Sequence, residues 1–304
     1  MSLDAPSPHA PAYADLHLHS AFSDGTFTPE EIADRARQAG LRAVALTDHD
    51  TVEGCERMGE ACRKAGIEFI AGTELTTELD GYELHLLGYG LDIHHAGLLA
   101  QLAGCQTVRQ KRIREMVERL NGLNIPLSAD AVFALARCGS PGRPHVARAL
   151  VEAGVCATVD AAFERFLKKH RPAWVPKFKL AAPDAIELIH AAGGLAVMAH
   201  PGLNRMDELI PELVGAGLDG VECLHTKHSS AQADHYLRLA RQYGLLVTGG
   251  SDCHGHTKGR PLIGTVRLPY EHVRRLLAEA GRRKAEARGE TPRPTSAPAV
   301  VEPA

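Results

Sequence analysis

The sequence predicts an α/β fold built on a parallel sheet, with a helical segment inserted into it. Short apolar strands alternate with amphipathic helices over residues 13–98, and the same alternation returns after residue 174. Such alternation is typical of parallel sheets covered by crossover helices. Between the two halves, residues 99–173 show mostly helical periodicity. We therefore expect a sheet domain formed by 13–98 and 174–282, and a helical insertion over 99–173.

Local signals place the elements of the first half. Thr28 as the capping residue, Pro29 at the first position and Glu31 three residues after the cap predict the start of a helix, which Gly40 ends. The pair Asp80-Gly81 predicts the turn of a hairpin. The predicted strands cover 13–19, 43–47, 68–72, 75–79 and 83–88, and a second helix covers 52–65.

The second half repeats the strand–helix pattern. Its predicted strands are 194–199, 220–224 and 246–249, and they run into His200, His225 and Asp252. In a barrel of βα units, the carboxyl ends of the strands carry the active site, so these polar residues are candidates for function. The predicted helices cover 183–192, 206–216 and 230–243 in the sheet domain, and 108–120, 129–136, 144–153 and 158–168 in the insertion.

The composition is that of a soluble globular protein, with 44% hydrophobic and 23% charged residues. The net charge of −3 gives no reason to expect binding of a polyanion by the whole chain. The charge is uneven, because residues 99–173 carry twelve Lys and Arg against six Asp and Glu, which leaves −9 on the rest of the chain. No apolar run approaches the roughly 20 residues that span a bilayer, and the N-terminus lacks the pattern of a signal peptide.

Seven cysteines are scattered along the chain without a Cys-X-X-Cys pair. This favours reduced thiols in the cytoplasm over a disulfide framework or a cysteine zinc site. Residues 1–12 are rich in Pro and Ala, residues 283–304 are rich in Pro, Thr, Ser and Ala, and both segments are expected to be disordered. No feature points to an obligate protein partner.

The first candidate metal ligands are the histidines of Asp15-Leu16-His17-Leu18-His19. Successive side chains of a strand point to opposite faces, so His17 and His19 share one face and lie about 7 Å apart. Two imidazoles at this spacing can converge on one metal ion, with bonds of about 2 Å. Two hydrogen-bonded histidines near the surface explain an isolated His-X-His equally well, so the rest of the chain must decide.

Further candidate ligands lie at or near the ends of the other predicted strands. They are Asp24, His49, Glu74, His85, His200, Asp252 and His254. Each alone has a structural explanation, since an Asp before Gly is usually a turn residue and His85 fits a half-buried strand position. Together the candidates are six histidines and three carboxylates, more than one ion accepts, which predicts two or three ions. Nitrogen and oxygen ligands suit Zn²⁺, Mn²⁺ or Fe²⁺.

These residues carry a resemblance to a known family. The segments His17-Leu18-His19, Ser23-Asp24-Gly25, Thr47-Asp48-His49-Asp50, Ala199-His200-Pro201 and Ser251-Asp252-Cys253-His254, together with Glu74, are similar to the motifs of the PHP family. This is the polymerase and histidinol phosphatase family of metal-dependent phosphoesterases. The resemblance covers about 13–98 and 174–268, and it implies a distorted (β/α)7 barrel with three metal ions, of which Mn²⁺ is the expected species.

The resemblance also implies a ligand set for each ion. The first ion would be held by His17, His19, Glu74 and Asp252. The second would be held by Glu74, His85 and His200, with Glu74 bridging the two, and the third by Asp24, His49 and His254. Glu74, His200 and Asp252 are then the predicted catalytic residues.

The insertion resembles one subgroup of the family in particular. Its segment 142–150, Gly-Arg-Pro-His-Val-Ala-Arg-Ala-Leu, resembles one PHP subgroup, the bacterial 3′,5′-nucleoside bisphosphate phosphatases, which also trim the 5′ ends of short RNAs. Arg143 follows a Ser140-Pro141-Gly142 turn that can present its guanidinium inward, and arginine binds phosphate bidentately. Arg109 and Arg112 share one helix face. Each of these arginines is otherwise explained as a solvated surface residue.

The expected function is removal of the 3′-phosphate from a nucleoside 3′,5′-bisphosphate, with 5′–3′ exonuclease activity on short RNA as a further expectation. A phosphorylated nucleotide or short oligonucleotide is the expected partner, covered by the insertion as a cap. His225 and His228 are expected to contact the phosphate or to protonate the leaving oxygen. Four alternatives remain open: a histidinol phosphatase, a cyclic phosphodiesterase, a non-catalytic PHP binding module, and an amidohydrolase-like enzyme that cleaves C–N bonds.

Overall fold

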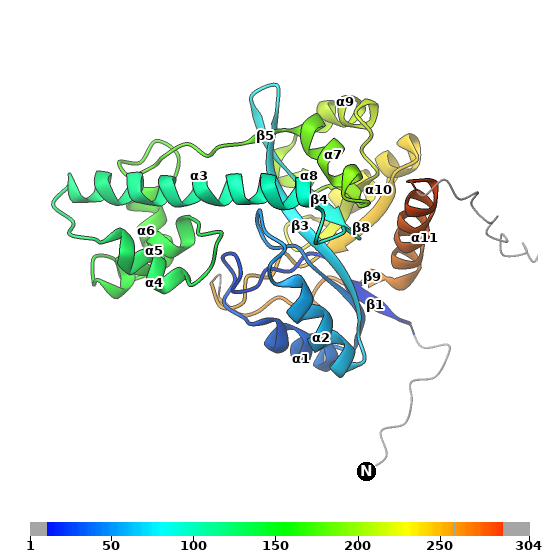
Figure 1. Ribbon diagram of the computed structural model, residues 1–304, viewed down its shortest axis with the longest axis horizontal. Coiled ribbons are helices and arrows are strands. Elements are labelled where there is room, and N and C mark those ends of the chain that lie inside the picture. The colour runs from blue at the N-terminus through cyan, green and yellow to red at the C-terminus, as the bar shows by residue number, and fades with distance from the viewer. Residues whose placement is uncertain (1–10, 258, 288–304) are drawn as a thin grey trace, which may run out of the picture.

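The computed structural model of the chain describes residues 11–257 and 259–287, and within them it shows a barrel-shaped sheet with a helical extension on one side (Figure 1). The strands of the main sheet follow the order β8-β7-β6-β4-β3-β2-β1-β9. Their bounds are Tyr13–Asp15 (β1), Leu41–Leu46 (β2), Glu68–Leu79 (β3), Tyr82–Tyr89 (β4), Leu195–Met198 (β6), Gly220–His225 (β7), Leu246–Gly250 (β8) and Leu268–Pro269 (β9). A short strand β5, Leu180–Ala181, pairs with β3.

The sheet nearly closes into a barrel between β1 and β8. The chain leaving β1 continues beside β8, where the amide of Leu16 donates to the carbonyl of Gly249 at 3.0 Å. A parallel bridge between Leu18 and Cys253 extends this contact. Among the barrel strands, β4 is antiparallel to both of its neighbours, and β1–β2, β2–β3, β6–β7 and β7–β8 are parallel pairs. The predicted α/β barrel is thereby confirmed, and β4 and β9 are its antiparallel strands.

The hairpin that joins β3 and β4 differs in part from the prediction. Its turn is at Asp80-Gly81, as predicted, with φ of 51° and 81°, the positive values that a two-residue type I′ turn requires. The predicted strand 75–79 is not separate, because β3 runs without a break from Glu68 to Leu79 and pairs with β4 along its second half. The first predicted strand, 13–19, is regular only to Asp15.

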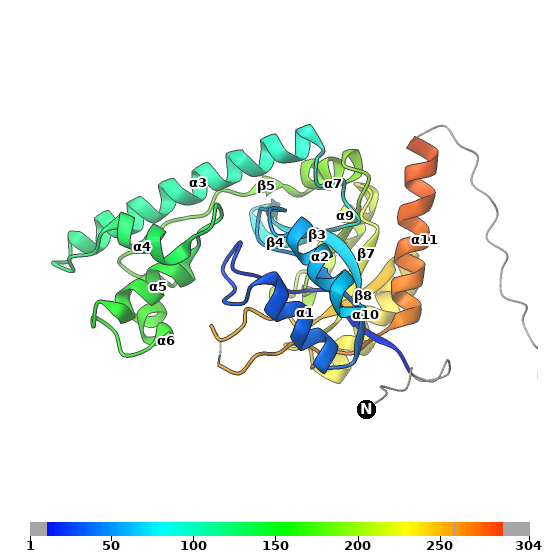
Figure 2. The same ribbon diagram turned by 60° about the horizontal axis from the view of Figure 1, so that its bottom comes forward.

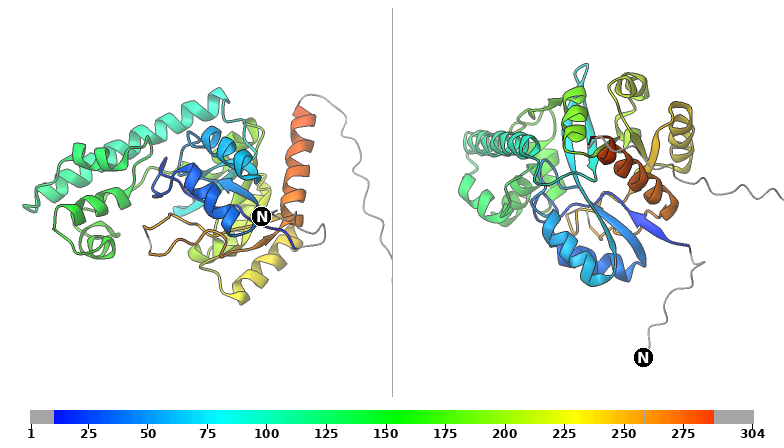
Figure 3. Two further views of the ribbon diagram at one scale, coloured as in Figure 1. Left: turned by 90° about the horizontal axis from the view of Figure 1, so that it is seen from below. Right: turned by 45° about the vertical axis from the view of Figure 1, so that its right-hand side comes forward.

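Helices surround the outside of the barrel (Figures 2 and 3). They are α1 Pro29–Gln38, α2 Cys55–Ala65, α7 Ala182–Ala191, α8 Pro201–Asn204, the 3-10 turn Asp207–Leu209, α9 Ile210–Gly215, α10 Ser230–Tyr243 and α11 Tyr270–Ala287. The predicted capping box of α1 is present, since Thr28 accepts from the amide of Glu31 and the Glu31 carboxylate accepts from the amide of Thr28.

Helix α11 has no counterpart among the predicted elements. It lies on the side of the barrel away from the insertion, where Val273, Leu276 and Ala280 are buried against barrel strands (Figure 1). The predicted disordered tail began at residue 283, whereas α11 continues to Ala287. The rest of that tail, and residues 1–10 of the predicted disordered N-terminus, lie outside the described residues. No helix in the described ranges is both long enough and apolar enough to cross a membrane.

The extension contains α3 Ala96–Asn121, α4 Ala129–Ala136, α5 Arg143–Glu152, α6 Val159–Ala162 and a π-helical turn, Phe163–Leu167. Helix α3 links it to the barrel. Leu98 and Leu102 near the start of α3 belong to the barrel core, whereas Ile113 and Met116 belong to a second core formed with α4, α5 and α6. The extension is thus a packed unit held on one long, continuous helix (Figure 2).

Candidate metal centre

The structure brings all nine predicted metal ligands together at one end of the barrel. Their ring nitrogens and carboxylate oxygens form four overlapping groups, and within each group these atoms lie within 4.8 Å of one another. The groups are His19, Asp24, His49 and His254; His17, Glu74 and His200; His17, His19 and Asp252; and His49, Glu74 and His85. The division differs from the one that the family resemblance implied, because His19 also joins Asp24, His49 and His254, and His49 also joins Glu74 and His85.

Glu74 lies at the middle of the site, where its two carboxylate oxygens face different histidines. Oε1 lies 2.7 Å from Nδ1 of His85 and 3.1 Å from Nε2 of His200. Oε2 lies 3.0–3.4 Å from ring nitrogens of His17, His19 and His49. Burial raises the pKa of Glu74, but the neighbouring histidines lower it by more, so the carboxyl is held well below its usual pKa. A carboxylate with two such faces has the geometry of a bridging ligand.

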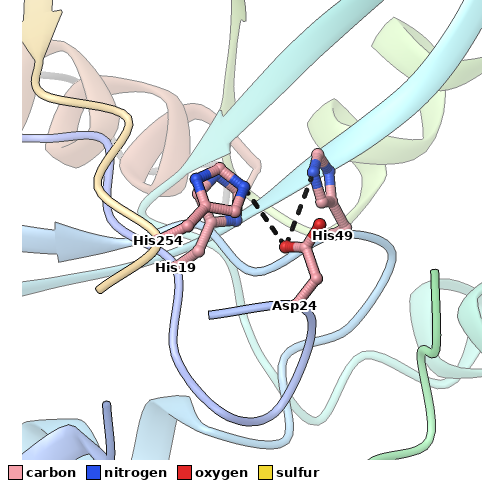
Figure 4. Close-up of side chains that lie close together, drawn as sticks. All are labelled: His19, Asp24, His49 and His254. Atoms are coloured by element: carbon pink, nitrogen blue, oxygen red, sulfur yellow. Dashed lines mark ion pairs between the residues drawn. The ribbon is translucent and has the colours of Figure 1, made fainter. Parts of the chain in front are cut away.

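Asp24 organises a second part of the site (Figure 4). Its Oδ1 lies 3.2 Å from Nε2 of His254 and 3.9 Å from Nε2 of His49. The rings of His19 and His254 stack with their centroids 4.1 Å apart, so their edges point to the same space (Figure 4). These four side chains come from three separate loops that follow β1, β2 and β8.

A buried carboxylate that was not predicted folds the loop carrying Asp24. Asp48 accepts hydrogen bonds from the amide and hydroxyl of Ser20, at 2.7 and 2.6 Å, and from the hydroxyl of Ser23 at 2.5 Å. The loop turns so closely that a Cβ at Gly25 would lie 2.3 Å from the carbonyl oxygen of His19. Glycine is therefore required beside Asp24.

The segment that carries Asp252 is also held by a buried carboxylate, that of Asp15. Asp15, fully buried, accepts from the amides of Ser251 at 2.8 Å and Gly264 at 3.0 Å. Asp252 itself has φ of 52°, a conformation uncommon for a residue other than glycine. Its Oδ1 lies 3.6 Å from Nε2 of His17 and 3.3 Å from Nε2 of His19.

The donor set fits a cluster of divalent cations. Several buried atoms of the site make no hydrogen bond to any described residue, and a buried polar atom without a partner costs free energy. They are Nε2 of His17, both ring nitrogens of His19, Oδ1 of Asp24, Nδ1 of His49, Oε2 of Glu74 and Nδ1 of His200. Ions placed among these nitrogens and oxygens would satisfy them, and no thiolate takes part, which suits Mn²⁺, Zn²⁺ or Fe²⁺.

A cavity of about 250 Å³ opens over this cluster, between the barrel and the insertion. Seven of the nine predicted ligands line it, and so do the three predicted arginines, Arg109, Arg112 and Arg143. Arg109 is paired with Asp50, to whose Oδ2 its Nη2 lies at 2.6 Å. Arg143 is the first residue of α5, where the preceding turn directs it to the cavity.

Two further polar residues at the site escaped prediction. Lys177 lines the same cavity and its Nζ lies 2.8 Å from Oε1 of Glu83. Glu222, in β7, is fully buried and its Oε1 lies 3.1 Å from Nδ1 of His17. The sequence signal for Glu222 was available, since a carboxylate in the apolar run Gly220–Leu224 requires a buried partner.

The predicted substrate contacts by His225 and His228 find no support in the cavity, because neither residue lines it. The side chain of His225 is fully buried behind Asp252. His228 has both ring nitrogens engaged by the backbone, since Nδ1 donates to the carbonyl of Cys223 at 2.9 Å and Nε2 accepts from the amide of Gly202 at 3.1 Å. No nitrogen of His228 is left for a substrate.

Comparisons with known proteins agree with this geometry. The model of the PHP domain matches residues 15–126. A 5′-3′ exoribonuclease of Haemophilus influenzae is 36% identical over 79% of this chain and 89% of its own. A 3′,5′-nucleoside bisphosphate phosphatase of Chromobacterium violaceum is 33% identical over 83% of this chain and 94% of its own.

A solved structure is similar over nearly the whole chain. It is that of a proposed metal-dependent phosphoesterase from Bifidobacterium adolescentis, with a TM-score of 0.81 and 34% identity, covering 89% of this chain and 97% of its own. The likeness therefore includes the insertion as well as the barrel. On the fold, the nine converging ligands and these relatives, the chain belongs to the PHP family of metal-dependent phosphoesterases.

Proposed function

We propose that this protein is a metal-dependent phosphatase that removes the 3′-phosphate of nucleoside 3′,5′-bisphosphates and leaves 5′-mononucleotides. The observation that carries the proposal is that one cavity holds both the cluster of candidate ligands and three arginines with Lys177. A substrate with two phosphates needs both groups, because one phosphate would lie at the metals and the other among the cationic side chains. The Chromobacterium violaceum relative is named for this activity.

The cofactors of the proposed reaction are two or three divalent ions, with Mn²⁺ the expected species and Zn²⁺ or Fe²⁺ the alternatives. Glu74, His200 and Asp252 would hold them, together with the other six predicted ligands. When bound, such ions polarise phosphoryl oxygens and lower the pKa of water towards neutrality. The protein's part is to fix the ligands, orient the substrate for in-line attack and limit access of bulk water.

Arg112 and Arg143 are the residues best suited to the second phosphate. The charge of Arg109 is already paired with Asp50, whereas Nη2 of Arg112 is buried and makes no hydrogen bond to a described residue. Burial, and then the nearby Arg143 and Arg109, lower the pKa of Arg112 to about 9. An incoming phosphate would relieve this repulsion, because a buried charge is costly until it is paired.

A small side cavity opens beside Arg112. It is lined by Asp50, which pairs with Arg109, by Arg109, Arg112, Lys177 and Thr76, and by the apolar side chains of Cys105, Val108 and Phe178. The hydroxyl of Thr76 is buried and, among the described residues, has no hydrogen-bond partner. A phosphate oxygen that reached this cavity would accept hydrogen bonds from the hydroxyl of Thr76 and from the guanidinium of Arg112.

Trimming of short RNA from the 5′ end follows from the same arrangement. The first nucleotide of a 5′-phosphorylated RNA carries a 5′-phosphate and a 3′-phosphodiester, the same pair of groups as a bisphosphate. The Haemophilus influenzae relative is named as a 5′-3′ exoribonuclease. We expect this activity to release 5′-mononucleotides one at a time.

The proposal places the enzyme in the cytoplasm without an obligate protein partner. All seven cysteines are free thiols, and six of the seven are among the buried core residues, which fits a reducing compartment. The location and the absence of a partner stay predictions.

A substrate panel tests the proposed function. Purified protein loaded with Mn²⁺ would be assayed with adenosine 3′,5′-bisphosphate, AMP, histidinol phosphate, a cyclic phosphodiester and an amide. The proposal predicts the highest kcat/KM for the bisphosphate. Only that substrate has one phosphate for the metal cluster and another for the cationic side chains of the cavity. A higher kcat/KM for histidinol phosphate, the cyclic diester or the amide would overturn it in favour of the corresponding alternative.

A further inference from the structure

Strand β7 supplies none of the nine candidate ligands, yet two of its side chains contact three of them. The strand carries a bulge: Glu222 is opposite Thr248 and Leu224 is opposite Gly249, so Cys223 is an extra residue. Side chains of a regular strand alternate, and Glu222 and His225 would point to opposite faces. Because of the extra residue, the side chains of Glu222 and His225 point to the same face. Bulges are known to re-aim side chains in this way.

Glu222 contacts two candidate ligands at once. Its Oε1 lies 3.1 Å from Nδ1 of His17, and its Oε2 accepts from the backbone amide of His200 at 2.8 Å. A carboxylate can only accept, so Nδ1 of His17 carries the proton and Nε2 presents its lone pair. That Nε2 is the atom facing Glu74 at 3.4 Å and Asp252 at 3.6 Å.

The contact with His200 acts on the backbone. His200 has φ of 29° and ψ of 55°, a left-handed conformation that costs free energy for a residue with a side chain. The hydrogen bond from its amide to Glu222 stabilises this conformation. The conformation in turn directs Nε2 of His200 to Oε1 of Glu74, 3.1 Å away.

His225 contacts the third candidate ligand. Its Nδ1 accepts from the amide of Lys227 at 3.1 Å, which leaves the proton on Nε2 in the neutral ring. That Nε2 lies 3.7 Å from Oδ2 of Asp252, while Oδ1 of Asp252 faces His17 and His19. His225 therefore contacts Oδ2 of Asp252, while Oδ1 faces the metal cluster.

We propose that Glu222 and His225, brought to one face by the bulge in β7, are positioning residues that set the ring of His17, the backbone of His200 and the carboxylate of Asp252 for metal binding. The proposal rests on the metal cluster and is independent of which phosphoester is the substrate. Residues that orient metal ligands in this way typically contribute 10- to 100-fold to metal affinity.

Asp219 offers a matched control for Glu222. It is also a buried carboxylate that contacts a histidine and a backbone amide of the barrel, since its Oδ2 lies 2.8 Å from Nε2 of His190 and 2.8 Å from the amide of Ala196. His190 and Ala196 are not among the candidate ligands. Asp219→Asn and Glu222→Gln each remove one buried charge and keep the shape of the side chain.

The experiment is equilibrium dialysis of the metal-free protein against increasing free Mn²⁺, with thermal unfolding of the metal-free forms as a check on folding. We expect Glu222→Gln to raise the Mn²⁺ concentration at half-saturation by about 10- to 100-fold, and Asp219→Asn to leave it within about twofold of the wild type. Glu222→Asp, which keeps the carboxylate, should recover part of the lost affinity. Unchanged binding in Glu222→Gln, or an equal loss in Asp219→Asn, would overturn the proposal.

A second variant covers the case in which Glu222→Gln does not fold. In His225→Asn, the side-chain oxygen can replace Nδ1 as acceptor for the amide of Lys227, while the Nε2 contact with Asp252 is removed. We expect weaker Mn²⁺ binding with an unfolding temperature close to that of the wild type. Wild-type Mn²⁺ affinity in this variant would contradict the role assigned to His225. It would also contradict the proposal that Glu222 and His225 position the metal ligands together.

Discussion

Glu74 and His85 lie on neighbouring strands of the β3–β4 hairpin, and Nδ1 of His85 is 2.7 Å from Oε1 of Glu74. The second oxygen of the same carboxylate faces a different set of histidines, among them His49 at 3.0 Å. The long, unbroken β3 fixes Glu74 at the point where these two sets meet. If two ions bind here, this carboxylate would hold both, and its charge should matter more than its shape.

Replacement of Glu74 tests this directly. Glu74→Gln keeps the shape of the side chain but removes the negative charge between two ions, a loss of several kcal/mol of electrostatic stabilisation. We expect kcat to fall by roughly 1000-fold, at 1.4 kcal/mol per factor of ten, and the metal content to fall as well. Elemental analysis and steady-state kinetics would measure both, and near-wild-type turnover with full metal content would rule out the bridging role.

Asp252→Asn should behave in the same way, because the site needs an anionic oxygen facing His17 and His19. The expected result is loss of turnover together with at least one ion per chain, while circular dichroism stays that of the wild type. Asp219→Asn is the control, since it removes a buried carboxylate away from the site. If Asp252→Asn retained activity equal to that of Asp219→Asn, Asp252 could not be a metal ligand.

Arg143→Ala tests the second phosphate. A charge-assisted hydrogen bond contributes roughly 1.5–3 kcal/mol, so kcat/KM for a 3′,5′-bisphosphate should fall by about 10- to 150-fold. A monophosphate lacks the second group and should lose much less. Arg165→Ala removes an exposed arginine of the same insertion and should change neither value. Equal losses on both substrates in Arg143→Ala would mean that Arg143 binds the reacting phosphate or supports the fold.

The histidine beside Arg143 gives a prediction about pH. Burial, with the nearby Arg148, lowers the pKa of His145 from 6.5 to about 4, and its Nδ1 accepts from the amide of Gly142 at 3.0 Å. Since the folded pKa is depressed, the stability that neutral His145 contributes is present above pH 6.5 and is lost as the pH falls towards 4. At 1.36 kcal/mol per pKa unit, the loss is roughly 3 kcal/mol.

The measurement is urea unfolding of the wild type and of His145→Asn between pH 7 and pH 4. Asn can accept from the amide of Gly142 but does not titrate, so the variant should lose less stability than the wild type over this range. Parallel stability curves for the two proteins would show that His145 is not held neutral by its surroundings.

Much of the fold could be predicted because its signals are local. The capping box at Thr28 and the Asp80-Gly81 turn each depend on a few neighbouring residues, and the structure contains both. The strand–helix alternation also identified the strands and loops from which the nine candidate ligands converge. Helix α11 was missed although Val273, Leu276 and Ala280 are spaced for one buried helix face.

Other features could not be predicted because they depend on contacts between distant segments. Glu222 contacts His17 from 205 positions away along the chain, and the bulge that aligns it with His225 has no turn residue to mark it. The pairing of Arg109 with Asp50 likewise joins the insertion to the barrel. His225 ends a strand and His228 follows it, as candidate ligands do elsewhere in the chain, and only the structure shows that both rings contact the backbone.

The product formed from adenosine 3′,5′-bisphosphate tests the central claim most directly. Phosphorus NMR of the reaction with the Mn²⁺-loaded protein distinguishes 5′-AMP from 3′-AMP in one spectrum. The claim that the reacting 3′-phosphate lies at the metal cluster while Arg112 and Arg143 hold the 5′-phosphate predicts inorganic phosphate and 5′-AMP in equal amounts. Formation of 3′-AMP, or no hydrolysis of the bisphosphate by protein that carries its metals, would contradict it.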